Sequence, residues 1–486
     1  MIVISALEGV TDNLLQAAHL AKINNPRGYR RIAATLRTRH IALVDQLPLD
    51  STEQNTLHAD INQLLFEMLD NCQQLAGHAS SESLSLKYRD RIASIGERLS
   101  ARILAALLRQ NNLRGVAIDA TDLIITDDVF GYAKPDLIQT KRKIEEYLLP
   151  LLRSDMVPVV TGYIGATSAG DVTTMGRGGS DYSASILSQG IHADEIWMWS
   201  DVDGMMSADP IDIPDAKVIN QLSYGEVEEL AYFGARILHP RMIKPLRNAS
   251  IPLRVKNIYK PDKPGTLITD ADDAHADIKA ITMIRGIRMM GQRNGSLERI
   301  SRIVDEVFAK QTGSPVEVMI SSQSSSQSAL YFVIPTTTSA SRRVLIEEIE
   351  EKLQQQPDSV AWELDTTRVV TVIGENLNQK AALVGSILQA IDDCPLMGYA
   401  PGPNGNSLSL VFSNSDYAGR ALNNIHALIH LWQARFERQM APFLRRIIFY
   451  LDQSVIHLLV CIIDSIRNHA ILVNQFWVAV QIHLIV

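Results

Sequence analysis

The sequence predicts an α/β protein: a mainly parallel sheet covered by helices on both faces, followed by a tandem of smaller α+β units. Two observations lead to this fold class. Over residues 1–270, short apolar strands alternate with amphipathic helices, which is typical of parallel sheets. Beyond residue 277, the order strand–helix–strand–strand–helix occurs twice, in units of about 75 residues each.

The composition is that of an ordinary globular protein with two or three domains, since 46% of its 486 residues are hydrophobic and 21% are charged. A net charge of −8 argues against nucleic acid as the main partner. The three cysteines lie far apart, which fits a reducing compartment and gives no metal-binding pattern. No signal peptide is recognisable, and no stretch before residue 440 is long and apolar enough to span a membrane. We therefore expect a cytoplasmic protein with no membrane partner.

Apolar runs and helical periodicity define the elements of the first region. We expect strands at 2–5, 115–120, 157–165, 195–204 and 252–256. We expect helices at 13–23, 32–47, 54–75, 89–110, 140–153, 182–191 and 223–234.

Polar clusters follow three of these strands, at Ser5–Asp12, Gly162–Asp181 and Ser200–Gly204. Ligands of parallel sheets bind beyond the carboxyl ends of the strands. The sequence therefore predicts a ligand site at this edge of the sheet.

The stretch GRGGSD, residues 176–181, is the most informative of these clusters. Its glycines precede a helix, a combination that binds anions, and Arg177 suits phosphate or carboxylate oxygens. Asp181 suits an ammonium group or Mg²⁺. The plain alternative is a solvated turn capped by Ser180 or Asp181. No P-loop is present, and Asp181 stands where a dinucleotide fingerprint needs its third glycine.

The second region contains the two-fold repeat. Its first unit has expected strands at 278–290, 315–322 and 328–336 and helices at 294–310 and 341–355. Its second unit has strands at 368–377 and 407–414, helices at 379–392 and 416–429, and a linker at 393–406. The pair is either a dimerisation scaffold or a set of effector-binding modules. The run SSQSSSQS at 321–328 is a flexible loop or a source of polar groups for a ligand.

Four stretches carry a resemblance to a known family: TGYIGATSAGDVTTMGRGGSDYSA, WSDVDGMMSADP, LSYGEVEELAYFGARILHPR and IPLRVKNIYKPDKPGTLI. With the double βαββα unit, they resemble the aspartate kinases of the amino-acid kinase superfamily, over residues 1 to about 425. The resemblance implies an amino-acid-kinase-type α/β/α sandwich followed by tandem ACT domains. Glutamate 5-kinase, acetylglutamate kinase and uridylate kinase share the core, but FGARILHP and the ACT pair favour aspartate kinase.

The resemblance also implies an activity. Such a protein transfers the γ-phosphate of ATP to the β-carboxylate of L-aspartate and gives 4-phospho-L-aspartate, the first step of lysine, threonine and methionine biosynthesis. Mg²⁺ is expected to bridge the phosphates, without an assignable ligand on the protein. Lysine or threonine is the implied feedback effector of the ACT domains, and a homodimer or higher oligomer is the implied assembly.

Site residues follow from the same motifs. Arg177 and Asp181 are the implied catalytic residues, pairing with the α-carboxylate and the ammonium group of aspartate. The implied substrate-binding set adds Ser5, Thr11, Glu97, Tyr163 and Ser180. The implied nucleotide-binding set is Ser200, Asp201, Met206, Arg236 and Ile237. His239, in LHPR, is interpreted as a structural or capping residue.

Departures from the family pattern shape the remaining expectations. Met206 and Ile211 stand where many members carry tyrosine and arginine, and Arg236 stands where lysine is common. The family opens with a Lys-Phe-Gly-Gly strand, which we expect to be missing here together with a helix.

The expected domains are a kinase domain at 1–270, ACT domains at 278–360 and 366–430, and an atypical tail at 431–486. Alternation from Phe476 to Val486 favours a strand or an aggregation-prone tail. The alternative function is that of a catalytically impaired, amino-acid-binding regulatory protein.

Overall fold

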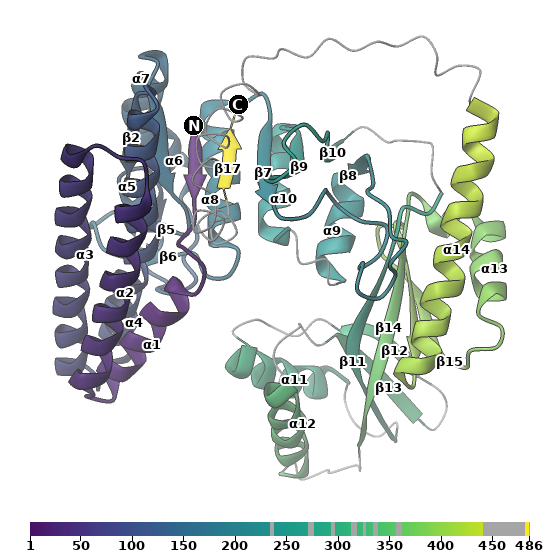
Figure 1. Cartoon of the computed structure of the whole chain (residues 1–486). Helices are drawn as coiled ribbons and strands as arrows, with labels where there is room; N and C mark the ends of the chain where they lie inside the picture. Colours follow the sequence, from purple (N-terminus) through teal and green to yellow (C-terminus); the bar gives the residue numbers. More distant parts are fainter. Residues whose placement is uncertain are drawn as a thin grey trace. The chain divides into compact units, whose positions relative to one another are not determined.

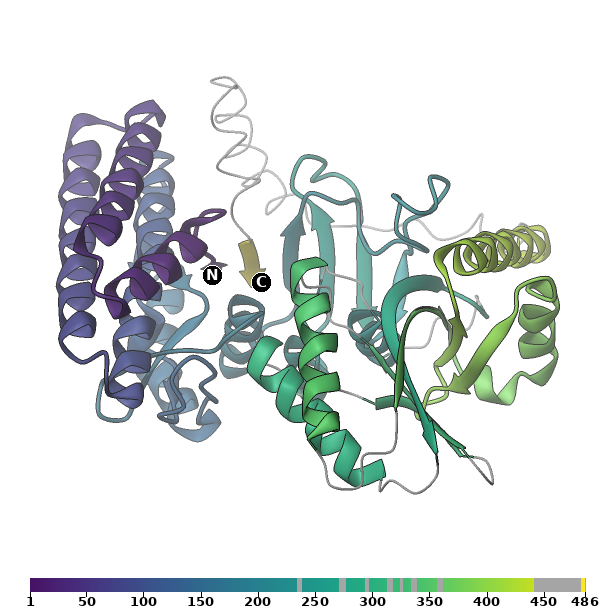
Figure 2. The ribbon, with the colours of Figure 1, turned by 90° about the horizontal axis from the view of Figure 1, so that it is seen from below.

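A computed structural model describes residues 1–486 except 234–237, 271–276, 293–296, 313–317, 324–326, 334–338, 356–361, 441–481 and 486. The chain forms two compact units (Figures 1 and 2). Unit 1 comprises Met1–Met205, Ile237–Asp270 and Phe449–Val486, and unit 2 comprises Met206–Arg236 and Ala271–Ile448.

Unit 1 is built on one sheet, in which the strands run in the order β2, β4, β1, β17, β7, β9 and β10. Their bounds are Gly115–Ile118, Val157–Thr161, Ile2–Ile4, Ile482–Ile485, Ile196–Ser200, Leu253–Asn257 and Thr266–Thr269. Strands β2, β4 and β1 pair in parallel, as do β7 and β9. The predicted parallel sheet is therefore confirmed, with β10 antiparallel at one side of β9.

Strand β17 is the unexpected member of this sheet. It lies between β1 and β7 and runs antiparallel to both, with Ile482 opposite Ile4 on one side and Trp199 on the other. Alternation in the tail predicted a strand, and Ile482–Ile485 confirms it for this segment. No local pattern predicts that residues from the far end of the chain pair in the middle of the sheet.

Helices of the first half of unit 1 pack against one another (Figure 1). They are α1 (Val10–Lys22), α2 (Pro26–Gln46), α3 (Ser51–Gly77), α4 (Glu82–Ala93) and α5 (Ile95–Gln110). Local capping fixes where they begin: the side chain of Asn25 accepts from Gly28 N at 3.0 Å, and that of Asp50 accepts from Glu53 N at 2.9 Å. The predicted helix at 89–110 is two helices, which meet at Ser94.

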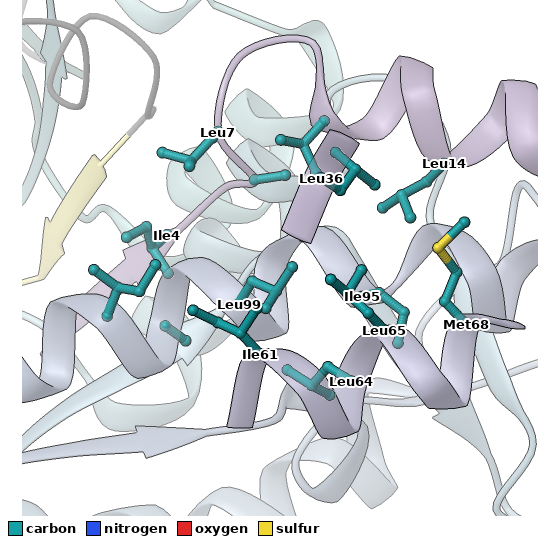
Figure 3. Close-up of a cluster of buried hydrophobic side chains, with 14 of the residues drawn as sticks. Ile4, Leu7, Leu14, Leu36, Ile61, Leu64, Leu65, Met68, Ile95 and Leu99 are labelled. Atoms are coloured by element: carbon teal, nitrogen blue, oxygen red, sulfur yellow. The ribbon is translucent and has the colours of Figure 1, made fainter. Parts of the chain in front are cut away.

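Buried side chains from these helices and from β1 form one hydrophobic core, whose members include Ile4, Leu14, Leu36, Ile61 and Leu99 (Figure 3). Each turns the apolar face of its element inward, as the periodicity predicted. Burial of each of these side chains stabilises the fold by roughly 1.5–3 kcal/mol. Helix α5 is therefore packed against β1 through this core, which fixes the position of α5 relative to the end of the strand.

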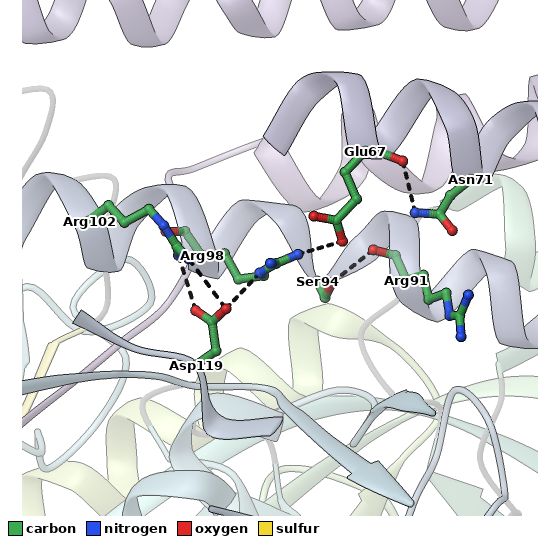
Figure 4. Close-up of polar contacts among 7 residues, drawn as sticks. All are labelled: Glu67, Asn71, Arg91, Ser94, Arg98, Arg102 and Asp119. Atoms are coloured by element: carbon green, nitrogen blue, oxygen red, sulfur yellow. Dashed lines mark hydrogen bonds and ion pairs between the residues drawn. The ribbon is translucent and has the colours of Figure 1, made fainter. Parts of the chain in front are cut away.

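An ionic network ties α5 to the residue that follows β2 (Figure 4). Asp119 accepts from Arg98 Nε at 2.9 Å and from Arg102 Nη1 at 3.0 Å, and Arg98 also reaches Glu67 at 2.7 Å. Burial acts to raise the pKa of Asp119, but the hydrogen bonds and charges of Arg102 and Arg98 outweigh it and lower that pKa. This network holds α3 and α5 in register with the sheet.

The other elements of unit 1 are a small sheet and further helices. Strands β3 (Ile125–Thr126), β5 (Ile164–Thr167) and β6 (Val172–Thr174) form a small separate sheet. The predicted helix at 140–153 consists of α6 (Leu137–Lys143), a π-helical turn η2 (Ile144–Leu148) and α7 (Leu149–Arg153). Helices α8 (Gly179–Ile191) and α10 (Pro240–Ala249) follow.

Unit 2 confirms the two-fold βαββα repeat. The first copy is β11 (Ala280–Gln292), α11 (Leu297–Thr312), β12 (Val318–Gln323), β13 (Gln327–Val333) and α12 (Ser339–Gln354). The second is β14 (Glu363–Ile373), α13 (Ala381–Ala390), β15 (Leu396–Pro401), β16 (Ser407–Phe412) and α14 (Ser415–Met440). The sheet order is β12-β13-β11-β14-β16-β15, so the copies join through the antiparallel pair β11–β14.

One expectation for unit 2 was wrong in detail. The segment expected as a linker at 393–406 contains β15, an edge strand in which Gly398 and the terminal Pro401 interrupt the strand signal. The serine-rich run at 321–328 overlaps the expected strands at both ends, and Ser321 and Ser328 lie in the paired strands β12 and β13 as expected. The middle of the run, 324–326, lies outside the described residues.

Residues 206–236 pack with unit 2, although they lie in the range assigned above to the kinase domain. Ser207 Oγ lies 3.0 Å from Nε2 of His426 on α14. This segment also carries β8 (Gln221–Ser223) and α9 (Tyr224–Tyr232), where Glu226 completes a capping box and forms a buried ion pair with Lys279 at 3.3 Å. The domain boundaries given above stay predictions.

Among the residues that the structure describes, no helix is long and apolar enough to cross a membrane.

Candidate active site

The first part of the candidate site is formed by the carboxyl ends of β1 and β4 together with α5. Gly162 N, after β4, donates to Ile4 O at 2.8 Å, so the two strand ends lie side by side. Ala6 N donates to Glu97 Oε1 at 3.3 Å, which brings the α5 carboxylate against the residue after Ser5. Ser5 and Glu97, 92 positions apart in sequence by their numbers, are therefore neighbours in space.

The glycine-rich loop closes the other side of this group. Gly176 and Gly178 have φ values of +73° and +69°, in the region that favours glycine. A Cβ on Gly162 would lie 2.7 Å from Ser180 Oγ, so the backbone after β4 touches the first turn of α8. The loop thus turns tightly onto the α8 N-terminus, whose first N–H groups have no partners within the helix.

Tyr163 lies at the centre of this arrangement. It has a φ of +67°, which is rare for a residue with a side chain, and its carbonyl accepts from Met175 N at 2.9 Å. Burial raises the pKa of the Tyr163 hydroxyl to about 12, although a hydrogen bond with the Thr174 side chain opposes the shift. The tyrosine therefore joins the β4 end to the glycine loop as a neutral group.

The charges of the group are unevenly exposed. Glu97 and Asp181 are buried, whereas Arg177 is exposed on the loop between the two left-handed glycines. Burial raises the pKa of Glu97 to about 8, and the Ala6 N–H opposes this shift. Glu97 Oε2 and Ser5 Oγ are buried atoms with no hydrogen-bond partner among the described residues. Such atoms are usually satisfied by a ligand or water, so they indicate a polar ligand here.

The structure therefore brings five predicted residues together: Ser5, Glu97, Tyr163, Ser180 and Asp181. Arg177 belongs to the same loop. Thr11 is half-buried in the first turn of α1, and no hydrogen bond among the described residues links it to this group.

Of the predicted nucleotide-binding residues, the structure places only Ser200 and Asp201 in one described turn. Ser200 ends β7, and its hydroxyl donates to Asp201 at 3.2 Å. Asn257, at the end of β9, donates to Asp201 O at 3.2 Å and orders this turn. Met206 belongs to unit 2, while Arg236 and Ile237 lie outside the described residues. These assignments stay predictions.

Within the described ranges, no cluster of three or more His, Cys, Asp or Glu side chains could hold a metal ion.

Two residues that sequence reasoning missed support the glycine loop. Oδ2 of the buried Asp90 accepts from Thr174 N at 2.8 Å and from Gly131 N at 2.6 Å. Arg241 donates to Met175 O and, at 3.5 Å, to Ala133 O. No local signal marks Asp90, because it lies inside a helical pattern. Arg241 ends the quoted LHPR motif and could have been singled out there.

His239 is confirmed as a capping residue. Its Nδ1 accepts from Arg241 N at 3.3 Å at the start of α10, and its ring lies against Gly178, where a Cβ would come within 2.1 Å of Cγ. Burial lowers the pKa of His239, the charge of Asp181 raises it, and Arg241 and Arg177 lower it further. The uncharged ring thus packs against the glycine loop at Gly178.

Comparison with known proteins agrees with this geometry. The model of the amino acid kinase family matches residues 1–257, more than half of the chain. The chain therefore belongs to the amino acid kinase family.

Among its relatives is aspartokinase 1, chloroplastic, of Arabidopsis thaliana, which is 32% identical over 394 residues, covering 77% of this chain and 63% of that protein. Lysine-sensitive aspartokinase 3 of Escherichia coli (strain K12) is 30% identical over 308 residues, covering 63% of this chain and 66% of that protein. The chain thus spans slightly less than two thirds of the length of these relatives.

Solved structures share the fold. The structure of E. coli aspartokinase III in complex with aspartate and ADP superimposes with a TM-score of 0.69 at 24% identity, covering 88% of this chain and 92% of that one. The same enzyme in complex with lysine and aspartate gives a TM-score of 0.71, covering 87% and 91%. The amino-acid-kinase fold and the βαββα pair that follows it are therefore both present.

Proposed function

We propose that this protein is an aspartate kinase, which transfers the γ-phosphoryl group of ATP to the β-carboxylate of L-aspartate and releases 4-phospho-L-aspartate and ADP. One observation carries the proposal: two buried carboxylates, Glu97 and Asp181, lie with the exposed Arg177 around one set of strand ends. In this charge pattern the guanidinium is complementary to the α-carboxylate of a free amino acid, and the two carboxylates are complementary to its ammonium group.

The roles follow from the charges. Arg177 presents a guanidinium fork that suits the α-carboxylate of the substrate. Asp181 and Glu97 take the ammonium group, and the unpartnered Glu97 Oε2 is an acceptor available to it. Ser5 Oγ and Ser180 are hydroxyl partners for the remaining oxygens. The β-carboxylate then points towards the nucleotide, whose turn includes Ser200 and Asp201.

The chemistry needs positioning more than covalent help. In phosphoryl transfer, attack by a carboxylate oxygen on the γ-phosphorus depends on alignment and on neutralising the phosphate charge. Mg²⁺ bound to the nucleotide supplies part of that neutralisation. The α8 N-terminus and the N–H groups of the glycine loop offer further positive potential to the transferred group.

We also propose that the βαββα pair binds an end-product amino acid, lysine or threonine, and joins two subunits. The support comes from the comparisons. One relative is named lysine-sensitive aspartokinase 3, and the structure of E. coli aspartokinase III, which shares the fold of this chain, was solved in complex with lysine and aspartate. The reaction would then be the first step of lysine, threonine and methionine biosynthesis, with feedback from a product.

Product trapping tests the proposal. The chain is incubated with ATP, Mg²⁺ and hydroxylamine, which converts an acyl phosphate into a hydroxamate, and L-aspartate is compared with L-glutamate. We expect aspartyl hydroxamate only with aspartate, strongly reduced in Arg177→Ala and unchanged in Arg153→Ala, an exposed arginine on α7. Hydroxamate from glutamate but not from aspartate would assign a different carboxylate kinase.

A further inference from the structure

The glycine loop is held by contacts that its own sequence does not contain. Residues 175–179 carry Arg177 between two left-handed glycines, a conformation that a free chain samples only part of the time. The loop therefore needs contacts with other segments if it is to keep one conformation before its ligand binds.

Arg241, in the first turn of α10, makes the most extensive of these contacts. Its guanidinium donates through Nη1 to Met175 O, directly before the glycines, and through Nη2 to Ala133 O at 3.5 Å. The same group lies 4.5 Å from the ring centroid of Tyr132 and 4.5 Å from that of Tyr182 on α8. One side chain thus joins the loop before the glycines, the helix after them, and the neighbouring 129–133 loop.

Tyr132, His239 and Asp90 also contact the same loop or its flanking residues. A Cβ on Gly176 would lie 2.7 Å from Tyr132 Cδ2, and a Cβ on Gly178 would lie 2.1 Å from His239 Cγ. On the other side, Asp90 binds the N–H groups of Thr174 and Gly131. Arg241 lies where these supports meet, because it stacks on Tyr132 and follows His239 by two residues.

We propose that Arg241 is a positioning residue, which keeps the Met175–Gly179 loop in the shape that presents Arg177 and the α8 N-terminus to the substrate. The inference rests on the proposed function, because it concerns how the same site binds aspartate. Arg241 acts through the backbone of Met175 and touches no substrate. Its planar fork can reach two carbonyls while stacking on two rings, which an ammonium group cannot do.

The proposal predicts a particular kinetic signature. Without Arg241 the loop samples its binding shape only a fraction of the time, and apparent affinity falls by that fraction. If the competent fraction drops to about one tenth, the KM for aspartate rises about tenfold, while saturating aspartate restores the loop and leaves kcat within about twofold. A purely structural role would instead lower the folded fraction, so that kcat per total protein falls and KM stays unchanged.

The test measures the KM for aspartate and kcat for the full chain and for Arg241→Ala, Arg241→Lys and Lys244→Ala. Lys244 is an exposed cation on the same helix and should behave like the wild type. We expect the Arg241→Ala signature above, an intermediate KM for Arg241→Lys, and partial recovery of the Arg241→Ala KM with millimolar guanidinium. Should Arg241→Ala not fold, Arg241→Lys and its KM carry the test.

An unchanged KM in both Arg241 variants, or a fall in kcat alone, overturns the inference. These results are distinct from failure of the proposed function, in which the wild-type chain itself shows no aspartate-dependent turnover. In that event, calorimetric titration with aspartate still compares loop competence in the wild type and Arg241→Ala, and equal affinities would overturn the inference.

Discussion

The protonation of Glu97 gives a prediction that can be worked out from the structure. Its carboxyl group is buried against Ala6 N, and its pKa of about 8 means that roughly nine molecules in ten carry the proton at pH 7. If the substrate ammonium binds this carboxylate, the opposite charge lowers the pKa well below 7. Aspartate binding at pH 7 should therefore release about 0.9 proton per site.

Calorimetric titration measures this proton directly. The binding enthalpy of aspartate is compared at pH 7 in buffers with different ionisation enthalpies, and the slope gives the number of protons released. The slope should correspond to about 0.9 proton for the wild type and should approach zero for Glu97→Gln, which cannot ionise. A wild-type slope near zero, or an equal slope in Glu97→Gln, would refute the assignment of Glu97 to the ammonium group.

The same shift sets a pH dependence of stability. Because the folded-state pKa of about 8 lies above the usual 4.5, the folded state holds the proton more tightly than the unfolded state. The stabilisation from this group is full below pH 4.5 and is lost as the pH rises to about 8. In this window the loss is about 1.4 kcal/mol per pH unit, and at most about 5 kcal/mol in all. Urea unfolding at pH 6 and pH 8 should show a smaller difference in Glu97→Gln.

Two further predictions concern close contacts. Gly178→Ala places a Cβ 2.1 Å from His239 Cγ and should abolish aspartate turnover. Gly170 also has a positive φ but has open space around it, so Gly170→Ala should keep turnover and lose only about 1–2 kcal/mol of stability. Equal activities of the two variants would contradict this prediction. Lys279→Met leaves the buried Glu226 without its ion-pair partner and should lower the free energy of unfolding by about 3–5 kcal/mol. Adding Glu226→Gln should restore part of this loss, and no recovery in the double variant would count against the ion pair as the cause.

Much of the fold was accessible from the sequence because its signals are local. Apolar periodicity located α1, α3 and α5, and repetition of the element order revealed the two βαββα units. The glycine loop was found because positive φ values and a helix start leave a compositional mark. Ser5, Glu97 and Ser180 came from the family resemblance, and contacts between residues far apart in sequence bring them close together.

Other features depend on non-local contacts that no local pattern encodes. Pairing of β17 between β1 and β7 joins opposite ends of the chain. Residues 206–236 look like one more strand–helix step of the first region, yet their buried groups find partners in unit 2. Asp90 reads as a polar position of an ordinary helix, because its partners, Gly131 and Thr174, are 41 and 84 positions away.

Aspartate-dependent ADP formation from ATP is the most direct test of the central claim. The full chain and Arg177→Ala are measured side by side, each with and without L-aspartate. We predict ADP release that requires aspartate in the wild type and is lost in Arg177→Ala. No aspartate-dependent release from a folded wild-type chain would contradict the kinase assignment. If lysine or threonine still raised its melting temperature, the amino-acid-binding regulatory function would take its place.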